Sequence, residues 1–242
     1  MNLELRNDGL LTGRENMQRD LQLIDRVRTG SVDLALRLYQ WSPWCVSLGA
    51  NQQSDRIDRE ACRARNIEVV ERPTGGRAVL HANELTYAFA TRIPSGKSAM
   101  DVYRAFHRML HEALVHIAPE ISLSTLAPSL REHYAASGPL GQVCFSAHAP
   151  SELLWDDRKV VGSAQRVIDG TILQHGSILC GPGHEQLGML LHGDHEMRIR
   201  IVEATQRASA TLSEAAGRTV EPLEIARLLE QRLTLETLSG LV

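Results

Sequence analysis

The amino-acid sequence predicts a mixed α/β protein, and two observations support this prediction. Short runs rich in β-branched residues recur along the chain, and runs with apolar residues at helical spacing lie between them. The chain has 242 residues, of which 43% are hydrophobic. It is therefore long enough for one large domain with a buried core, or for one domain with a small appendage.

The expected strands are short and are separated by turn residues. The leucines between residues 32 and 39 alternate as in a strand, so that Leu34, Leu36 and Leu38 point one way. Asp156-Asp157 and Asp169-Gly170 would join the last three strands through tight turns, and an Asp-Gly pair is a strong hairpin signal. We expect strands at 3–11, 32–39, 45–49, 67–70, 84–90, 152–155, 158–167 and 171–179, the first of them at an edge of the sheet.

Helical spacing is clearest in the long segment after Ser98, which can cap the first turn with its hydroxyl group. The segment 55–66 is expected to form a helix with Ile57, Ala61 and Ala64 facing inward. The expected helices are 16–27, 55–66, 99–117, 185–191, 211–217 and 222–233, while 197–204 is ambiguous.

Charge and composition exclude several classes of function. The formal net charge is −3 and the pI is about 6.4, so the basic stripe of a nucleic-acid-binding protein is not expected. No apolar run is long enough to span a bilayer, and the first residues do not resemble a signal peptide, so no membrane partner is expected. The four cysteines are scattered without a C-x-x-C pair, which favours a reduced, cytoplasmic chain over a disulfide framework or a zinc ribbon.

Two histidines on the long helix raise the question of a metal. His107 and His111 lie four residues apart and could share an ion, but no H-E-x-x-H motif or third ligand accompanies them. We therefore expect these histidines on a solvated helix face, and we expect no metal site.

A glycine pair between two expected strands is the first candidate for a functional site. Gly75 and Gly76 are flanked by Arg72 and Arg77 and are followed by His81. Paired glycines let the backbone approach a ligand closely, and free N–H groups beside an arginine can face an anion or a carbonyl. The same residues also fit a hairpin with a type I′ or II′ turn, so both interpretations stay open at this point.

Cys144 and Lys159 are the second candidate. Cys144 ends the long connection 118–142, and Lys159 lies in an apolar strand, where lysine is uncommon unless it is at an edge or has a function. An ammonium near a thiol lowers the thiol pKa, and the resulting thiolate can attack an acyl group to form a thioester. Alternatively, Lys159 is an exposed strand charge and Cys144 a buried apolar residue. A polar run, 174–177, interrupts the last strand.

Together these segments resemble the lipoate–protein ligase and octanoyltransferase superfamily. Its three signatures are similar to 72–81 with 84–87, to 158–166 and to 173–177, and its early segments are similar to 16–17 and 47–52. The resemblance covers 16–179 in order and spacing. It implies a biotin/lipoate protein ligase catalytic-domain fold, with mixed β-sheets flanked by helices.

Within the superfamily, the resemblance is closest to the LipM type of octanoyltransferase. That class carries its cysteine in a Cys-Phe … Pro-Ser … Glu-Leu segment, and 144–153 fits this pattern with a slightly longer spacing. Another class has its cysteine just before the histidine of the third signature, where this chain has Gln174 before His175. Related amidotransferases also have a cysteine in this region, but their other signatures fit less well.

The resemblance implies transfer of an octanoyl group from octanoyl-acyl carrier protein, through a Cys144 thioester, to a lysine of a lipoyl-domain protein. Acceptors of this kind are the glycine cleavage H protein and the 2-oxoacid dehydrogenase E2 subunit. No cofactor is implied. Lys159 would lower the pKa of Cys144 and help to deprotonate the incoming lysine. The implied substrate-binding residues are Arg72, Thr74, Gly75, Gly76, Ala78, His81, Gly162, Ser163, Ala164, His175 and Gly176.

Two other functions remain open. An ATP-dependent lipoate–protein ligase would use Lys159 to contact an acyl-adenylate and would not need Cys144. A non-catalytic protein would bind a lipoyl or carrier domain as a scaffold. For the domain organisation we expect one acyltransferase domain over 1–242, with a large mixed sheet, a small C-terminal β/α portion and a helical C-terminal extension at 205–242. The stretch after His175 is short for the accessory domain that many ligases carry.

Overall fold

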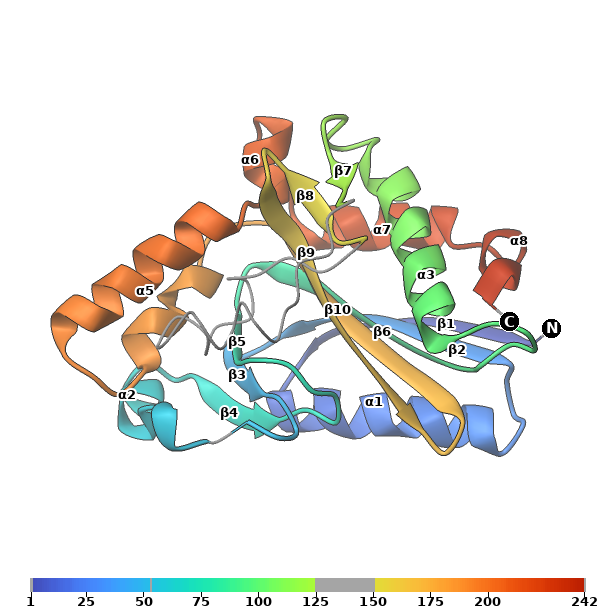
Figure 1. Cartoon of the computed structure of the whole chain (residues 1–242), viewed down its shortest axis with the longest axis horizontal. Helices are drawn as coiled ribbons and strands as arrows, with labels where there is room; N and C mark the ends of the chain where they lie inside the picture. Colours follow the sequence, from blue (N-terminus) through green and yellow to red (C-terminus); the bar gives the residue numbers. More distant parts are fainter. Residues whose placement is uncertain (1, 53, 125–150, 242) are drawn as a thin grey trace.

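The computed structural model describes residues 2–52, 54–124 and 151–241, which form two β-sheets with helices packed around them (Figure 1). The large sheet has seven strands in the order β1-β2-β6-β10-β9-β8-β7. These strands are β1 (Leu3–Leu11), β2 (Leu34–Trp41), β6 (Glu84–Arg92), β7 (Ser122–Leu123), β8 (Leu153–Trp155), β9 (Arg158–Ile168) and β10 (Thr171–Leu179).

The large sheet is mixed, because one pair of strands is parallel and the other pairs are antiparallel. β1 pairs with β2 in parallel, and helix α1 (Gly13–Arg28) makes the crossover that such a pair needs. The hairpin β9–β10 turns at Asp169-Gly170, where both residues have positive φ, as a type I′ turn requires. The predicted α/β class and the edge position of β1 are therefore confirmed.

The small sheet was not placed correctly by the sequence. It consists of β3 (Cys45–Leu48) in the centre, with β4 (Glu68–Glu71) parallel on one side and β5 (Val79–His81) antiparallel on the other. It therefore comes from the first half of the chain, and the expectation of a C-terminal β/α portion was wrong. The hairpin interpretation of the glycine pair was also wrong, because the strands before and after it pair with β3 and not with each other.

Helices cover both faces of the large sheet (Figure 1). α1 lies on one face, while α3 (Ala99–Leu114) and α7 (Pro222–Arg232) lie on the other. The remaining helical segments are η1 (Ser54–Arg56), α2 (Arg59–Ala64), η4 (His184–Leu190), α5 (His195–Ala208), α6 (Leu212–Ala216), α8 (Leu235–Leu238) and η5 (Ser239–Leu241). No helix in the described ranges is long and apolar enough to cross a membrane.

Two capping boxes fix the starts of the long helices. The hydroxyl group of Thr12 caps α1 with Glu15 as its partner, and Ser98 caps α3 with Asp101 as its partner, which confirms the predicted start of α3. The alternating leucines of β2 all point to the α3 face and join its core, as the sequence predicted.

The segment 55–66 is not one helix. Asp58 accepts a hydrogen bond from the backbone N–H of Ala61 and starts α2 there, after the separate turn η1. Because the helix starts later than expected, Cys62 is buried and Ala64 is exposed, so the prediction for Ala64 was wrong. The ambiguous segment 197–204 lies within α5, where few side chains are buried and the apolar pattern is weak.

Candidate active site

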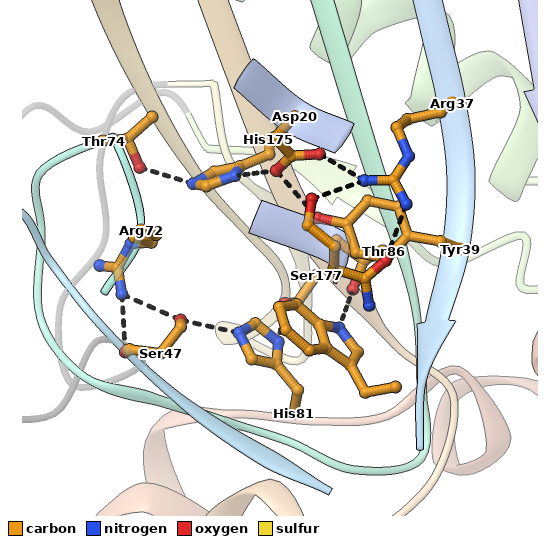
Figure 2. Close-up of polar contacts among 12 residues, drawn as sticks. Asp20, Arg37, Tyr39, Ser47, Arg72, Thr74, His81, Thr86, His175 and Ser177 are labelled. Carbon is orange, nitrogen blue, oxygen red and sulfur yellow. Dashed lines mark hydrogen bonds and ion pairs between the residues drawn. The ribbon is translucent and has the colours of Figure 1, made fainter. Parts of the chain in front are cut away.

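A pocket lies between the large sheet and the small sheet, beside α1 (Figure 2). The large sheet contributes residues of β2, β6, β9 and β10, and the small sheet contributes residues of β3 and β5. Among the described residues the lining consists of Met17, Tyr39, Trp41, Ser47, Arg72, Val79, His81, Thr86, Gly162, Ser163, Ala164, His175, Gly176 and Ser177. The structure thus brings together predicted residues from all three signatures.

The pairing of strands explains why the second and third signatures meet. β10 lies between β6 and β9, and Gly176 is opposite Ser163 on one side and Tyr87 on the other. A Cβ atom at Gly176 would lie 2.6 Å from the Ser163 hydroxyl and 2.8 Å from both the Gly162 carbonyl and the Tyr87 ring. A glycine is therefore required where these three strands come closest.

His175 connects the sheet to the arginine–glycine loop, which we define as residues 72–78. Its Nδ1–H donates to Asp20 at 3.0 Å, and its Nε2 accepts from the Thr74 hydroxyl at 2.5 Å (Figure 2). Burial lowers the pKa of His175, although the hydrogen bond to Asp20 and its charge act in the opposite direction. His175 is therefore a neutral imidazole that holds Thr74 in place.

Asp20 was missed by the sequence reasoning. Its carboxylate is fully buried and accepts hydrogen bonds from Arg37 at 2.7 Å and from the Tyr39 hydroxyl at 3.1 Å. Asn16 and Asp20 are one turn apart on the inward face of α1, and both contact Arg37. Polar residues on the apolar face of an amphipathic helix were the signal that could have revealed this cluster.

Arg72 shapes the arginine–glycine loop from inside. Its guanidinium donates to the Ser47 carbonyl at 2.8 Å, to the Gly75 carbonyl at 2.9 Å and to the Arg77 carbonyl at 2.7 Å. Gly76 has a φ of +96°, and a Cβ atom there would lie 2.8 Å from the Arg72 guanidinium. These contacts are those of a residue that holds the loop.

The rest of the loop lies behind the pocket and does not line it. Thr74 is buried against His175, and Ala78 is buried in the apolar cluster of the small sheet. The carbonyl of Gly76 packs against Gly49, where a Cβ atom would collide with it.

His81 belongs to a second buried network. Its Nδ1–H donates to Glu84 at 2.7 Å, its ring stacks on Trp41 with centroids 3.9 Å apart, and Thr86 and Ser177 donate to the same carboxylate oxygen. Burial alone would raise the pKa of Glu84, but His81 and these hydrogen bonds lower it below its usual value. Glu84 is a second residue that the sequence reasoning left out of the site.

Lys159 is not an exposed strand charge. Its ammonium lies 2.9 Å from the carboxylate of Glu152, and the two side chains are 3% and 4% exposed. The residues of β9 that follow Lys159 reach the pocket at Gly162, but Lys159 itself does not line it. The sequence did not identify Glu152 as a site residue. The signal that could have revealed it is its position just before the hairpin that leads to Lys159.

The expected solvated position of His107 was wrong. His107 is fully buried, its Nδ1–H donates to the Ser151 carbonyl at 2.6 Å, and its Nε2 accepts from the Ser163 hydroxyl at 2.9 Å. Burial lowers its pKa to about 4, with a smaller contribution from the charge of Lys159. In the ranges that the structure describes, no group of three or more potential ligands could hold a metal ion.

The cysteines divide into two groups. Cys45, Cys62 and Cys180 are buried, and burial raises the pKa of each thiol, to about 12 in Cys180. None of the three lines the pocket. Cys144, the predicted nucleophile, lies outside the described residues.

Comparison with known proteins identifies the family. The pattern of the family described as "Lipoyl protein ligase A/B catalytic domain" matches residues 12–234. Octanoyltransferase LipM of Clostridioides difficile (strain 630) is 34% identical over 212 residues, which cover 86% of this chain and 77% of that protein. Octanoyltransferase LipM of Exiguobacterium sibiricum is 36% identical over 217 residues, which cover 87% of this chain and 78% of that protein.

Solved structures support the fold. A bi-partite lipoate protein ligase from Thermoplasma acidophilum superposes with a TM-score of 0.68 at 20% identity, covering 99% of this chain and 84% of that chain. A lipoate–protein ligase A bound with ATP superposes with a TM-score of 0.57 at 18% identity, covering 100% of this chain and 99% of that chain. The predicted ligase-type fold is confirmed, and the chain belongs to the lipoyl protein ligase A/B catalytic domain family.

Proposed function

We propose that this protein is an octanoyltransferase of the LipM type. It takes an octanoyl group from octanoyl-acyl carrier protein and transfers it to a lysine of a lipoyl-domain protein, such as the glycine cleavage H protein or a 2-oxoacid dehydrogenase E2 subunit. The names of its relatives support octanoyl transfer. The reaction needs no cofactor, because a thioester donor and a thioester intermediate are close in free energy.

The buried Lys159–Glu152 ion pair is the observation that carries this proposal. Lysine is almost never fully buried without a partner and a reason, because removing an ammonium from water is costly. Glu152 lies directly after Ser151, at the end of the segment that contains Cys144. In this proposal the fixed cation favours the thiolate form of Cys144.

The first step is attack of the Cys144 thiolate on the thioester carbonyl of the donor. A new S–C bond forms, the carrier's S–C bond breaks, and the carrier leaves as a thiolate that takes a proton from water. The second step is attack of the acceptor amine on the octanoyl-enzyme. An N–C bond forms, the bond to Cys144 breaks, and the amine proton passes to the departing sulfur.

The pocket supplies the acyl site in this proposal. Its lining includes the large side chains of Met17, Tyr39 and Trp41, together with residues that are small or lack a side chain, such as Gly162 and Ala164. Each buried methylene contributes about 0.8 kcal/mol, so a pocket of fixed depth discriminates between chain lengths by about fourfold per methylene. Gly75 and Gly76 do not line this pocket, so in this proposal they support the acyl site through the loop that Arg72 holds.

The other cysteines support the choice of Cys144 indirectly. A buried thiol with a raised pKa is a poor nucleophile at neutral pH, and this describes Cys45, Cys62 and Cys180. At the position where another octanoyltransferase class carries its cysteine, this chain has Gln174, whose amide donates to the Tyr87 hydroxyl at 3.1 Å.

The helices after β10 support a single catalytic domain over 1–242, with 205–242 as its extension. Leu212, Ile225 and Leu229 pack into the same core as α3 and the large sheet. We place this domain and its reaction in the cytoplasm.

Intact mass spectrometry tests the nucleophile. The wild-type protein is incubated with octanoyl-acyl carrier protein and should gain one octanoyl group that hydroxylamine removes. The Cys144→Ala variant should gain none, while the matched Cys62→Ala variant should behave as wild type. Octanoylation that persists in Cys144→Ala, or that requires ATP and free octanoate, would refute the proposal and favour a ligase.

A further inference from the structure

Backbone hydrogen bonds fix Glu152 in place, in addition to the ion pair of its side chain. The Ser124 N–H donates to the Glu152 carbonyl at 2.8 Å, and the Ser151 N–H donates to the Ser124 carbonyl at 2.9 Å. His107 adds a third hydrogen bond, from its Nδ1–H to the Ser151 carbonyl. The backbone from which the Glu152 carboxylate projects is therefore fixed on both sides of the strand.

Lys159 is fixed just as firmly from the opposite side. Its backbone carbonyl accepts from the Ala210 N–H at 3.0 Å, and it pairs with Ser209 across an isolated bridge. On β8, Leu154 is its register partner, next to an irregularity that separates the pairs Leu153–Val161 and Leu154–Lys159. The two charged side chains thus meet between backbone segments that have little freedom to move.

Among the described residues, the neighbouring titratable groups from α3, β9 and η4 do not replace the carboxylate. His107 from α3 is neutral, because its pKa lies at about 4. Arg158, the preceding residue of β9, pairs with Glu214 of α6 at 3.0 Å. His184 of η4 is hydrogen-bonded to the Ser209 hydroxyl, and its other ring nitrogen lies 3.5 Å from the carboxylate of Glu185.

We propose that Glu152 is a positioning residue for Lys159: its carboxylate fixes the buried ammonium in place and compensates its charge. This inference rests on the proposed function, in which Lys159 takes part in acyl transfer. Lys159 then acts as a fixed cation that favours the Cys144 thiolate, and not as the base for the incoming lysine. This differs from the sequence-based expectation that Lys159 also deprotonates the acceptor.

The sequence makes a direct test possible, because Lys97 and Lys159 are the only lysines among its 242 residues. In protein labelled with 13C and 15N at lysine, the side-chain NMR spectrum contains two lysine signals, and Lys97→Arg leaves Lys159 alone. The titration midpoint of Lys159 is then measured in wild type, in Glu152→Gln and in Glu152→Asp. Glu230→Gln, which removes an exposed carboxylate from α7, is the matched control.

In Glu152→Gln the Lys159 midpoint should fall by at least one pH unit, a tenfold change in its proton equilibrium, because a buried ammonium loses this carboxylate. Glu152→Asp should fall by less, and Glu230→Gln should match wild type. If Glu152→Gln does not fold, Glu152→Asp carries the test. An unchanged midpoint in a folded Glu152 variant overturns the inference.

A second readout separates positioning from mere structural support. Octanoyl transfer by Glu152→Gln should fall at least tenfold at pH 7 and recover at higher pH, where the thiol of Cys144 ionises without help from the cation. A loss that is equal at every pH would overturn the inference. The Lys159 titration can be repeated in Cys144→Ala, so failure of the proposed nucleophile is distinguished from failure of the role given to Glu152.

Discussion

Gly176 is the position where the structure makes the sharpest quantitative prediction. In Gly176→Ala, the new Cβ atom meets the Gly162 carbonyl and the Tyr87 ring at 2.8 Å each, and the Ser163 hydroxyl at 2.6 Å. The hydroxyl can rotate away, but then it loses its hydrogen bond to His107. The carbonyl belongs to the backbone of β9 and can move only if the pairing of β9 with β10 is disturbed.

The expected cost follows from these contacts. Overpacking of this kind costs about 2 kcal/mol, and the lost hydrogen bond adds about 1 kcal/mol, so unfolding should be about 3 kcal/mol easier. For a chain of 242 residues this lowers Tm by about 6–12 °C. Transfer activity should fall as well, because Gly162 and Ser163 line the pocket.

Urea unfolding followed by circular dichroism measures the change in stability. Gly240→Ala is the matched control, since its Cβ atom would make only an ordinary 3.7 Å contact with Met109. We expect that control to change the free energy of unfolding by less than about 1 kcal/mol. If Gly176→Ala were as stable as Gly240→Ala, the close packing of the three strands around the site would be wrong.

Three further predictions concern the site. Gly76→Ala should lower the free energy of unfolding, measured in urea, by about 1–3 kcal/mol because the φ of Gly76 is +96°. Gly75→Ala should be tolerated, because its new Cβ atom would have no other atom within 4 Å. Equal effects of the two substitutions would contradict the loop geometry. Between pH 6.5 and 4 His107 takes up a proton in the unfolded chain but not in the folded chain. The free energy of unfolding should therefore keep the full His107 contribution above pH 6.5 and fall by about 3 kcal/mol toward pH 4. If His107→Gln showed the same pH dependence, the loss would belong to other groups. Thr74→Val should lower the free energy of unfolding by about 1 kcal/mol, because Thr74 loses its hydrogen bond to His175. It should also raise KM in transfer assays, because the loop is held less firmly. An unchanged KM would show that this hydrogen bond does not contribute to substrate binding.

Much of the fold could be predicted because the signals are local. The alternation of β2, the Asp-Gly turn of β9–β10 and the serine cap of α3 each depend on residues close in sequence. The pairing of β3 with both β4 and β5 could not be predicted, because the sequence of a short strand does not indicate which strands it pairs with. The glycine pair consequently looked like a hairpin turn.

The site divides in the same way. Signature residues such as His175 could be named from the resemblance, but their partners could not. Asp20 meets His175 across 155 positions of sequence, so only the packing of α1 on β10 reveals the contact. Glu152 and Lys159 are near in sequence, yet their burial and pairing depend on the irregular register of β8 and β9.

In the proposed mechanism, the octanoyl group is bound to Cys144 as a thioester between its release from the donor and its transfer to the acceptor. The most direct measurement is a chase with isolated octanoyl-enzyme, freed of donor and nucleotide, to which an apo lipoyl-domain protein is added. The enzyme should lose its octanoyl mass at the same rate as the acceptor lysine gains it. An octanoyl-enzyme that keeps its acyl group while the acceptor stays unmodified would rule out Cys144 as the carrier of the transferred chain.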